Sequence, residues 1–351
     1  MADQAGSIGI SGMGRIGRLL VRHAFESDKR GLGVRAVNSV YPAETIAHLL
    51  KYDTVHGTWK ADIRVDGGDL VINGARIRIV YERDPVAIPW KELGVELAVD
   101  ATGKFNDREG ASKHLQAGAR KVIITAPGKR MDLTVVMGVN DDRYVPQQHH
   151  LISAASCTTN CVAPVLHVID QSFGVKSAWM TTVHAFTGDQ NHMDNPHKDL
   201  RRARACTQSI IPTSTGAGKA LIDVLPHLAP YVNGISIRVP TPDVSLVDLT
   251  MQLKRQVDTA EAQAALLAAS QGVMAPYLGY VDEPLVSADY IGCDKSAVID
   301  GPSVAAAGDQ LKVLAWYDNE WGYANRVMDL AQTVSNSIPR ESDETWKEAV
   351  V

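Results

Sequence analysis

Residues 8–20 of this chain, Ile-Gly-Ile-Ser-Gly-Met-Gly-Arg-Ile-Gly-Arg-Leu-Leu, decide the first part of its fold. Within them, Gly12-Met13-Gly14-Arg15-Ile16-Gly17 forms a G-x-G-x-x-G turn between an apolar strand pattern and apolar residues at helical spacing. In such a turn, backbone N–H groups and the helix dipole can hold a pyrophosphate. The stretch therefore predicts a dinucleotide-binding turn, although by pattern alone it also fits a tight turn that binds nothing.

Short apolar segments alternate with helical patterns through the rest of the first half. We expect strands at 34–37, 97–100 and 122–125, and helices near 46–50 and over 107–118. Strands that alternate with helices form βαβ units, which build a parallel sheet. The first half is therefore predicted to be an α/β domain with a Rossmann-type parallel sheet.

The second half shows longer strand patterns with fewer helices between them. These patterns cover 179–186, 234–239, 244–254 and 311–318, and a final helical pattern runs over 323–334. Long strands with few crossover helices indicate a mixed or antiparallel sheet. We expect an α+β domain here, and we expect the last helix to return to the first domain.

The boundaries that follow divide the 351 residues into two domains, as the length itself suggests. The dinucleotide-binding domain is predicted at 1–156 and is rejoined by the C-terminal helix at 320–338. The domain that carries the catalytic candidates is predicted at 157–319. The polar, acidic tail 339–351 is expected to be disordered.

Composition excludes several classes of protein. The chain has 35 basic and 40 acidic residues, a formal net charge of −5, and four cysteines. A mildly acidic chain does not favour nucleic acid as a partner, and so few cysteines do not form a disulfide scaffold. Neither an apolar run of membrane-spanning length nor a secretory signal is evident. We expect a cytoplasmic protein with small-molecule substrates and no membrane association.

The second strand pattern ends in Val37-Asn38-Ser39, where dinucleotide-binding domains usually carry an acid. That acid accepts hydrogen bonds from the adenosine ribose 2′-OH of NAD and would repel the 2′-phosphate of NADP. Ser39 repels neither and can donate a hydrogen bond. The cofactor is therefore predicted to be NADP, NAD or both; Ser39 could also cap a turn while other contacts bind NAD.

Cys157 lies in Ser156-Cys157-Thr158-Thr159, just before an apolar stretch that begins at Val162. Serine and threonine are good N-caps, so we expect the thiol near a helix N-terminus, where the dipole lowers its pKa. The cysteines at 161, 206 and 293 are interpreted as small buried side chains. No spacing of cysteine and histidine completes a metal site, and none is predicted.

His184 ends the strand pattern Met180-Thr181-Thr182-Val183-His184. A lone histidine is usually structural. Beside Cys157, however, its imidazole could accept a proton and return it, as in other cysteine–histidine pairs. We therefore treat both residues as catalytic candidates.

Several long motifs closely resemble those of phosphorylating glyceraldehyde-3-phosphate dehydrogenases. The resemblance extends over residues 7–338 and rests on the stretches 12–18, 156–161, 184–190, 196–204, 212–217, 238–240 and 316–323. It implies that Cys157 attacks an aldehyde to form a hemithioacetal and that His184 takes the hydroxyl proton. Hydride then passes to the nicotinamide, and phosphate releases the resulting thioester as an acyl phosphate.

The resemblance also assigns residues to two anion sites. Thr187 and Arg238 are expected to hold the substrate phosphate. The attacking phosphate is assigned to Ser156, Thr158, Arg202, Thr215 and Gly216. Hydroxyls, guanidinium groups and backbone N–H groups are suitable phosphate donors. From its residues alone, the basic run 201–204 also fits a solvated loop or, less well, an RNA-binding patch.

For the cofactor, the resemblance implies contacts beyond the three glycines and Ser39. These are Arg15 and Ile16 at the pyrophosphate, Arg83 on the adenine side, Thr125 at the nicotinamide-side ribose, Asn319 at the carboxamide and Tyr323 near the nicotinamide ring. Two positions depart from the NAD-dependent pattern, because Ser39 replaces an Asp and Asn195 replaces a Leu. Both changes resemble the NADP-accepting, gluconeogenic-type members.

Two alternative functions remain open on sequence. Erythrose-4-phosphate dehydrogenase uses the same cysteine–histidine pair for a longer aldehyde, but the stretches 187–190 and 213–216 match the triose enzyme better. The other alternative is a catalytically silent interaction protein of this fold. Some photosynthetic relatives carry a redox switch of paired cysteines in a C-terminal extension, and the tail 339–351 has no cysteine. The resemblance also implies a homotetramer.

Overall fold

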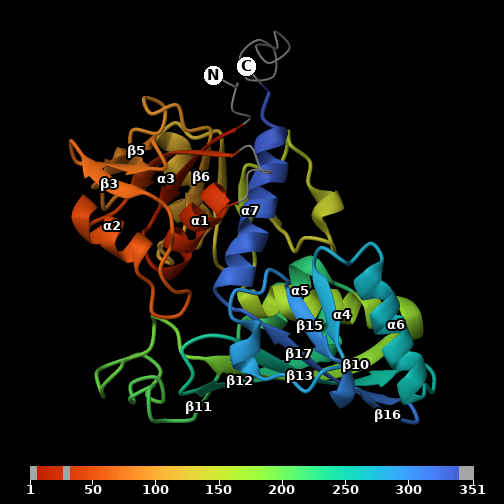
Figure 1. The fold of residues 1–351 in the computed structure, drawn as a ribbon. Helices are drawn as coiled ribbons and strands as arrows, with labels where there is room; N and C mark the ends of the chain where they lie inside the picture. The colour runs from red at the N-terminus through yellow and green to blue at the C-terminus, as the bar shows by residue number, and fades with distance from the viewer. Residues whose placement is uncertain (1–5, 27–31, 340–351) are drawn as a thin grey trace.

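Two β-sheets organise the chain, and a helix near the C-terminus joins them (Figure 1). The computed structural model describes residues 6–26 and 32–339. The predicted polar tail, apart from Pro339, lies outside the described residues. No helix among the described residues is both long enough and apolar enough to cross a bilayer.

The first sheet has nine strands in the order β3-β4-β5-β2-β1-β6-β7-β9-β8. Their bounds are β1 Ser7–Ser11, β2 Gly33–Asn38, β3 Ile63–Asp66, β4 Asp69–Ile72, β5 Ala75–Val80, β6 Leu97–Asp100, β7 Lys121–Ile124, β8 Leu133–Thr134 and β9 Leu151–Ser153. All pairs from β5 to β8 in this order are parallel, as predicted. The antiparallel edge β3-β4-β5 was not predicted. Its strands are short, so each one shows only a few positions of the alternation between apolar and polar residues that indicates a strand.

Three helices pack on this sheet and build its core. They are α1 Arg15–Glu26, α2 Ala43–Lys51 and α3 Arg108–Gln116. All three were expected from the sequence: α1 from the helical spacing after the glycine turn, and α2 and α3 from the patterns at 46–50 and 107–118. Apolar side chains of β1 and α1, such as Ile8, Ile10 and Leu20, are fully buried between the sheet and the helices. This burial holds the glycine turn after β1 at the carboxyl edge of the parallel strands.

The second sheet has eight strands in the order β11-β12-β10-β13-β17-β15-β14, with β16 paired to β17. Their bounds are β10 Val175–Ala185, β11 Ile211–Thr213, β12 Val232–Val239, β13 Ser245–Leu253, β14 Leu278–Val281, β15 Ala297–Asp300, β16 Ala305–Ala307 and β17 Gln310–Tyr317. The sheet is mixed, because β10 runs parallel to β12 but antiparallel to β13. This confirms the predicted fold class.

Helices cover one face of the second sheet, namely α4 Cys157–Phe173, α5 Ala217–Val224 and α6 Thr259–Gln271 (Figure 1). Side chains along β10, β13 and β17 alternate between buried and less buried positions, which is typical of a sheet with one covered face. Helix α4 contributes Val165, Leu166 and Ile169 to the core between the helices and the sheet.

The last helix, α7 Trp321–Asn336, lies along the first sheet's domain and packs against α1 (Figure 1). Val327, Leu330 and Val334 are buried in the same core as α1. The last helix therefore shares a buried core with α1 of the first sheet. Because α7 follows β17 directly, residues 318–320 lie at the junction of the two sheets.

Candidate active site

Strand register in the second sheet places two candidate residues side by side. On the parallel pair β10 and β12, His184 is the register partner of Arg238. Cys157 begins α4, whose N-cap Ser156 accepts a hydrogen bond from the N–H of Thr159 at 3.0 Å. Cys157 packs against the hydrophobic cores of both sheets, so the thiol lies where the two sheets meet.

The thiol of Cys157 and the imidazole of His184 are in contact. Cys157 Sγ lies 3.5 Å from His184 Nε2, and His184 Nδ1 donates a hydrogen bond to the carbonyl of Ala185 at 2.7 Å. With the proton on Nδ1, the lone pair of Nε2 faces the thiol. The sequence predicted this pair, and the geometry allows His184 to accept a proton from Cys157 or from a substrate hydroxyl beside it.

Burial dominates the protonation of both groups. It raises the pKa of the Cys157 thiol, while the positive charge of Arg238 and hydrogen bonds from Thr158 oppose that shift. The pKa of His184 falls to about 3, first through burial and then through the nearby Arg238 charge. The predicted lowering of the Cys157 pKa is therefore wrong for this pocket, because desolvation outweighs the start of the helix. Near pH 7 the pair consists of a neutral thiol and a neutral base.

Tyr317 supports this pair and was not assigned a role on sequence. Its buried hydroxyl hydrogen-bonds to Thr182 Oγ1 at 2.8 Å and to Thr158 Oγ1 at 3.0 Å. Its ring meets the His184 imidazole edge-on, with centroids 5.9 Å apart. Tyr317 lies inside the motif 316–323, but its position in an apolar strand shows nothing of these hydrogen bonds. The structure makes it a positioning residue for His184 and Thr158.

Arg238 and Thr187 form the beginning of an anion site. Arg238 Nη1 donates to Thr187 Oγ1 at 3.0 Å and to the Ala185 carbonyl at 3.0 Å. Asp189, which sequence reasoning did not single out, accepts hydrogen bonds from Thr187 and pairs with Arg202. The structure thus brings Thr187, Arg202 and Arg238 together beside His184.

Other residues assigned to the second anion site lie on neighbouring segments. Arg202 Nε donates to Thr213 Oγ1 at 3.1 Å, and Thr213 ends β11. Gly216 caps α5, and a Cβ atom added there would meet no heavy atom within 4 Å, so its backbone is open to a ligand. Thr215 precedes it. The hydroxyl of Thr158 points instead to Tyr317, as described above.

A cavity of about 360 Å³ lies at the carboxyl edge of the first sheet, over the glycine turn. Gly12 has a φ of +96°, and a Cβ atom there would lie 2.7 Å from the backbone nitrogen of Thr102. At Gly17 it would lie 1.9 Å from the carbonyl oxygen of Gly12, whereas at Gly14 it would meet nothing. Only glycine fits the first two positions, and the third leaves room for a ligand backbone to approach.

Polar groups of this cavity fit an anionic dinucleotide. Arg18 lines it, and its buried Nε has no hydrogen-bond partner among the described residues. Ser39 also lines it; its hydroxyl accepts the N–H of Tyr41 at 3.1 Å. Arg83 and Lys104 add positive charge, against one acid, Glu82. The residues present therefore suit an anionic dinucleotide, and Arg83, which was predicted on its adenine side, lines the cavity.

The remaining predicted cofactor residues have defined but different surroundings. The Arg15 side chain pairs with Asp53 and Glu320 rather than facing the glycine turn, Ile16 packs on the first core, and the Thr125 N–H donates to Asp100. Asn319 accepts from Ser245 Oγ at 2.6 Å, and the Tyr323 hydroxyl donates to Ala155 at 3.0 Å. Asn319 lies two residues before α7, and Tyr323 lies within α7. Ala155, the partner of Tyr323, lies two residues before Cys157. Asn195 is exposed on the loop 186–210 and does not line the cavity.

A dinucleotide cavity and a thiol in contact with an imidazole, at the junction of two sheets, fit the class of dinucleotide-dependent oxidoreductases. Comparison with known proteins narrows this class. The model of the glyceraldehyde 3-phosphate dehydrogenase NAD-binding domain matches residues 6–108, and the model of the C-terminal domain of the same enzyme matches 156–319. The chain belongs to the glyceraldehyde-3-phosphate dehydrogenase family, and its cofactor is NAD(P).

Relatives in several bacteria share almost the whole length. Glyceraldehyde-3-phosphate dehydrogenase 2 of Bacillus subtilis is 52% identical over 336 residues, which cover 95% of this chain and 98% of the relative. The enzyme of Geobacillus stearothermophilus is 52% identical over 330 residues (94% and 98%). Glyceraldehyde-3-phosphate dehydrogenase 2 of Streptomyces avermitilis is 46% identical over 332 residues (94% and 99%).

Proposed function

We propose that this chain oxidises glyceraldehyde 3-phosphate with phosphate and NAD(P)⁺, reversibly, to 1,3-bisphosphoglycerate and NAD(P)H. The observation that carries the proposal is the contact between Cys157 Sγ and His184 Nε2, next to the Arg238–Thr187 anion site. The substrate assignment follows the names of the relatives. The pair supplies the nucleophile and the base, and the anion site selects a phosphorylated aldehyde.

In the first half-reaction, His184 Nε2 accepts the thiol proton as Cys157 Sγ forms a bond to the aldehyde carbon. His184 returns this proton to the former aldehyde oxygen, which becomes the hemithioacetal hydroxyl. His184 then takes the hydroxyl proton back as the carbon–hydrogen bond breaks to leave a thioester on Cys157. When bound, NAD(P)⁺ accepts the hydride. The neutral imidazole, whose pKa lies far below 7, is available as this base at physiological pH.

In the second half-reaction, inorganic phosphate attacks the thioester carbon and the thiolate of Cys157 leaves. Arg202 and the backbone at Gly216 are proposed to hold this phosphate, together with the hydroxyls of Ser156, Thr158 and Thr215. Phosphate rather than water must be the acceptor, because hydrolysis would lose the thioester's stored energy. Arg238 and Thr187 hold the substrate's own phosphate.

We further propose that NADP is used at least as well as NAD. Ser39 lines the cavity at the end of β2, and the cationic side chains of Arg18, Arg83 and Lys104 surround it. A 2′-phosphate there meets positive charge, and Ser39 does not repel it as the acid usual at this position would. The contact that the sequence suggested for Asn195 adds nothing to this argument, because Asn195 lies on the exposed 186–210 loop and does not line this cavity. This cofactor use suits the gluconeogenic as well as the glycolytic direction.

The proposed homotetramer draws support from the uncovered face of the second sheet. Trp179 on β10 is 65% exposed and Ile235 on β12 is 48% exposed. Among the described residues, no helix covers this face (Figure 1), and large apolar side chains on one face of a sheet favour contact with a second copy. The domain division at 156 and 319 and a cytoplasmic location stay predictions.

One kinetic panel tests the proposal. It compares kcat/KM for glyceraldehyde 3-phosphate and erythrose 4-phosphate, each with NAD and NADP and each with and without phosphate. The proposal expects the triose phosphate to be the better substrate, with sustained turnover only when phosphate is present. A preference for the tetrose would favour erythrose-4-phosphate dehydrogenase. If neither substrate led to reduction of the dinucleotide, the result would favour the catalytically silent interaction protein.

A further inference from the structure

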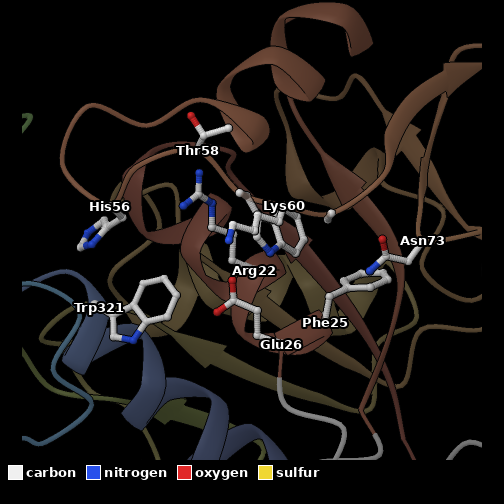
Figure 2. Close-up of a pocket in the computed structure, with 10 residues that line it drawn as sticks. Arg22, Phe25, Glu26, His56, Thr58, Lys60, Asn73 and Trp321 are labelled. Atoms are coloured by element: carbon white, nitrogen blue, oxygen red, sulfur yellow. The ribbon is translucent and has the colours of Figure 1, made fainter.

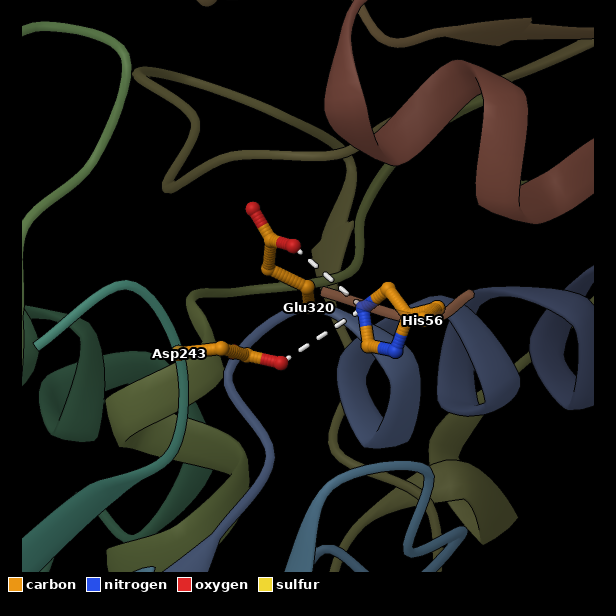
Figure 3. Close-up of side chains that lie close together, drawn as sticks. All are labelled: His56, Asp243 and Glu320. Carbon is orange, nitrogen blue, oxygen red and sulfur yellow. Dashed lines mark ion pairs between the residues drawn. The ribbon is translucent and has the colours of Figure 1, made fainter. Parts of the chain in front are cut away.

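Three side chains from distant segments meet at the junction of the two sheets, away from the Cys157–His184 pair. His56 follows α2, Asp243 lies between β12 and β13, and Glu320 precedes α7 (Figure 3). His56 Nε2 lies 3.4 Å from Glu320 Oε2 and 3.5 Å from Asp243 Oδ2. Their three ligand atoms lie within 4.8 Å of one another, and among the described residues no other group of three does so. Because the residues are far apart in sequence, no spacing motif reveals them.

Two of the three side chains are buried without hydrogen-bond partners. The His56 side chain is 2% exposed and that of Asp243 is 0% exposed. Within the described part of the chain, neither ring nitrogen of His56 and neither carboxylate oxygen of Asp243 has a hydrogen-bond partner. Buried polar groups are nearly always satisfied, and an unsatisfied buried carboxylate is especially unfavourable. Figure 3 shows the imidazole and both carboxylates pointing toward one another.

Two of the distances between these atoms match those of a zinc site. Zinc binds imidazole nitrogen and carboxylate oxygen at about 2.1 Å in a tetrahedron, which sets two ligand atoms about 3.4 Å apart. The two distances from His56 Nε2 agree with that edge, and the two carboxylate oxygens lie within 4.8 Å of each other. One imidazole with two carboxylates, and a fourth position for water, is a ligand set that Zn²⁺ accepts.

Acidic side chains outnumber basic ones around this cluster. Asp53, Asp243, Asp318 and Glu320 provide four carboxyl groups, and the guanidinium groups near them are those of Arg15 and Arg18. Arg15 donates to both oxygens of Glu320, including Oε2, which faces His56, and so orients that carboxylate as outer partners of metal ligands often do.

A pocket lies beside His56. Its volume is about 430 Å³, and His56 and Trp321 form one side of it, with Arg22 and Lys60 further along (Figure 2). The His56 ring leans on the Trp321 indole, with centroids 5.4 Å apart. This pocket reaches one side of the buried imidazole; Asp243 and Glu320 do not line it.

We propose that His56, Asp243 and Glu320 form a binding site for a divalent transition-metal cation, Zn²⁺ by ligand chemistry. The bound ion ties a loop of the dinucleotide domain to the β12–β13 loop of the second sheet and to the segment that carries Asn319. It stabilises this junction and takes no part in the chemistry at Cys157.

The test measures Zn²⁺ binding by competition with a chromophoric chelator, on metal-stripped Cys157→Ser protein so that the catalytic thiol does not compete. We expect one Zn²⁺ per chain. Asp243→Asn and His56→Gln, made in the same background, each weaken binding at least tenfold. His227→Gln is the matched control, because His227 pairs with Asp170 at 2.9 Å on the surface without a third ligand; it leaves affinity unchanged. Circular dichroism confirms that each variant folds.

Cobalt supplies a second readout that needs no site variant. The Cys157→Ser protein with one equivalent of Co²⁺ is expected to show the strong visible absorption of a tetrahedral site without thiolate charge-transfer bands. Equal Zn²⁺ affinity in all variants would overturn the proposal. So would the weak spectrum of octahedral Co²⁺, or thiolate bands, which would place the ion at one of the remaining cysteines.

Discussion

Replacing Arg238 by glutamine separates substrate binding from chemistry. Arg238 Nη1 contacts Thr187 Oγ1 and the Ala185 carbonyl at 3.0 Å, and lies 3.1 Å from His184 Nδ1. A hydrogen bond to a charged group contributes about 1.5–3 kcal/mol, and about 1.4 kcal/mol corresponds to a factor of ten. Arg238→Gln should therefore lower kcat/KM for glyceraldehyde 3-phosphate by roughly one to two powers of ten through the lost phosphate contact.

The same substitution also has an effect that does not depend on the substrate phosphate. The guanidinium charge opposes the raised pKa of the Cys157 thiol, so its loss makes the thiolate harder to form. This second effect slows both glyceraldehyde 3-phosphate and unphosphorylated glyceraldehyde equally. The ratio of their kcat/KM values isolates the phosphate contact.

The assay follows dinucleotide reduction with both aldehydes at saturating cofactor and phosphate. Arg204→Gln is the control, since Arg204 is exposed and pairs with Asp194 on the same loop as Arg202. We expect the ratio to fall at least tenfold in Arg238→Gln and to stay constant in Arg204→Gln. An equal loss on both aldehydes would show that Arg238 supports the pair but does not hold the substrate phosphate.

Three further predictions concern the base, the pH dependence and the cofactor. His184→Asn should slow acylation in single-turnover measurements by a factor on the order of 10²–10⁴, and an unchanged rate would remove His184 from the mechanism. His184, with a pKa of about 3 when folded and an ordinary value near 6.5, stays neutral in the fold while the unfolded chain takes up a proton. Its contribution to the free energy of unfolding should thus fall by about 1.4 kcal/mol per pH unit between pH 6.5 and 3; equal slopes for wild type and His184→Asn in urea unfolding would contradict this. Ser39→Asp should strongly reduce kcat/KM for NADP and leave or improve that for NAD, whereas a wild-type preference for NAD of tenfold or more would show that the missing acid has been misinterpreted.

Local patterns predicted most of what positions the site. The glycine turn and its flanking apolar residues identified the parallel sheet, because the requirement for glycine at residues 12 and 17 is set by close backbone contacts. The N-cap Ser156 located the start of α4 within one residue. Such features depend on neighbours in sequence, so they are visible without a structure.

Features that depend on tertiary burial were not predictable. The raised pKa of Cys157 comes from the packing of two cores around the thiol, which no helix-start pattern reports. Tyr317 acts through hydrogen bonds to two different elements, α4 and β10. The group of His56, Asp243 and Glu320 exists only because three loops converge at the junction of the sheets.

The most direct test of covalent catalysis at Cys157 is a single-turnover reaction without phosphate, followed by mass spectrometry of the peptide that contains this residue. Wild-type protein mixed with glyceraldehyde 3-phosphate and excess NAD⁺ or NADP⁺ should form one equivalent of reduced dinucleotide per active site. The Cys157 peptide should then carry the acyl group, which added phosphate releases. Full dinucleotide reduction with an unmodified Cys157, or the same yield from Cys157→Ser, would contradict the thioester mechanism.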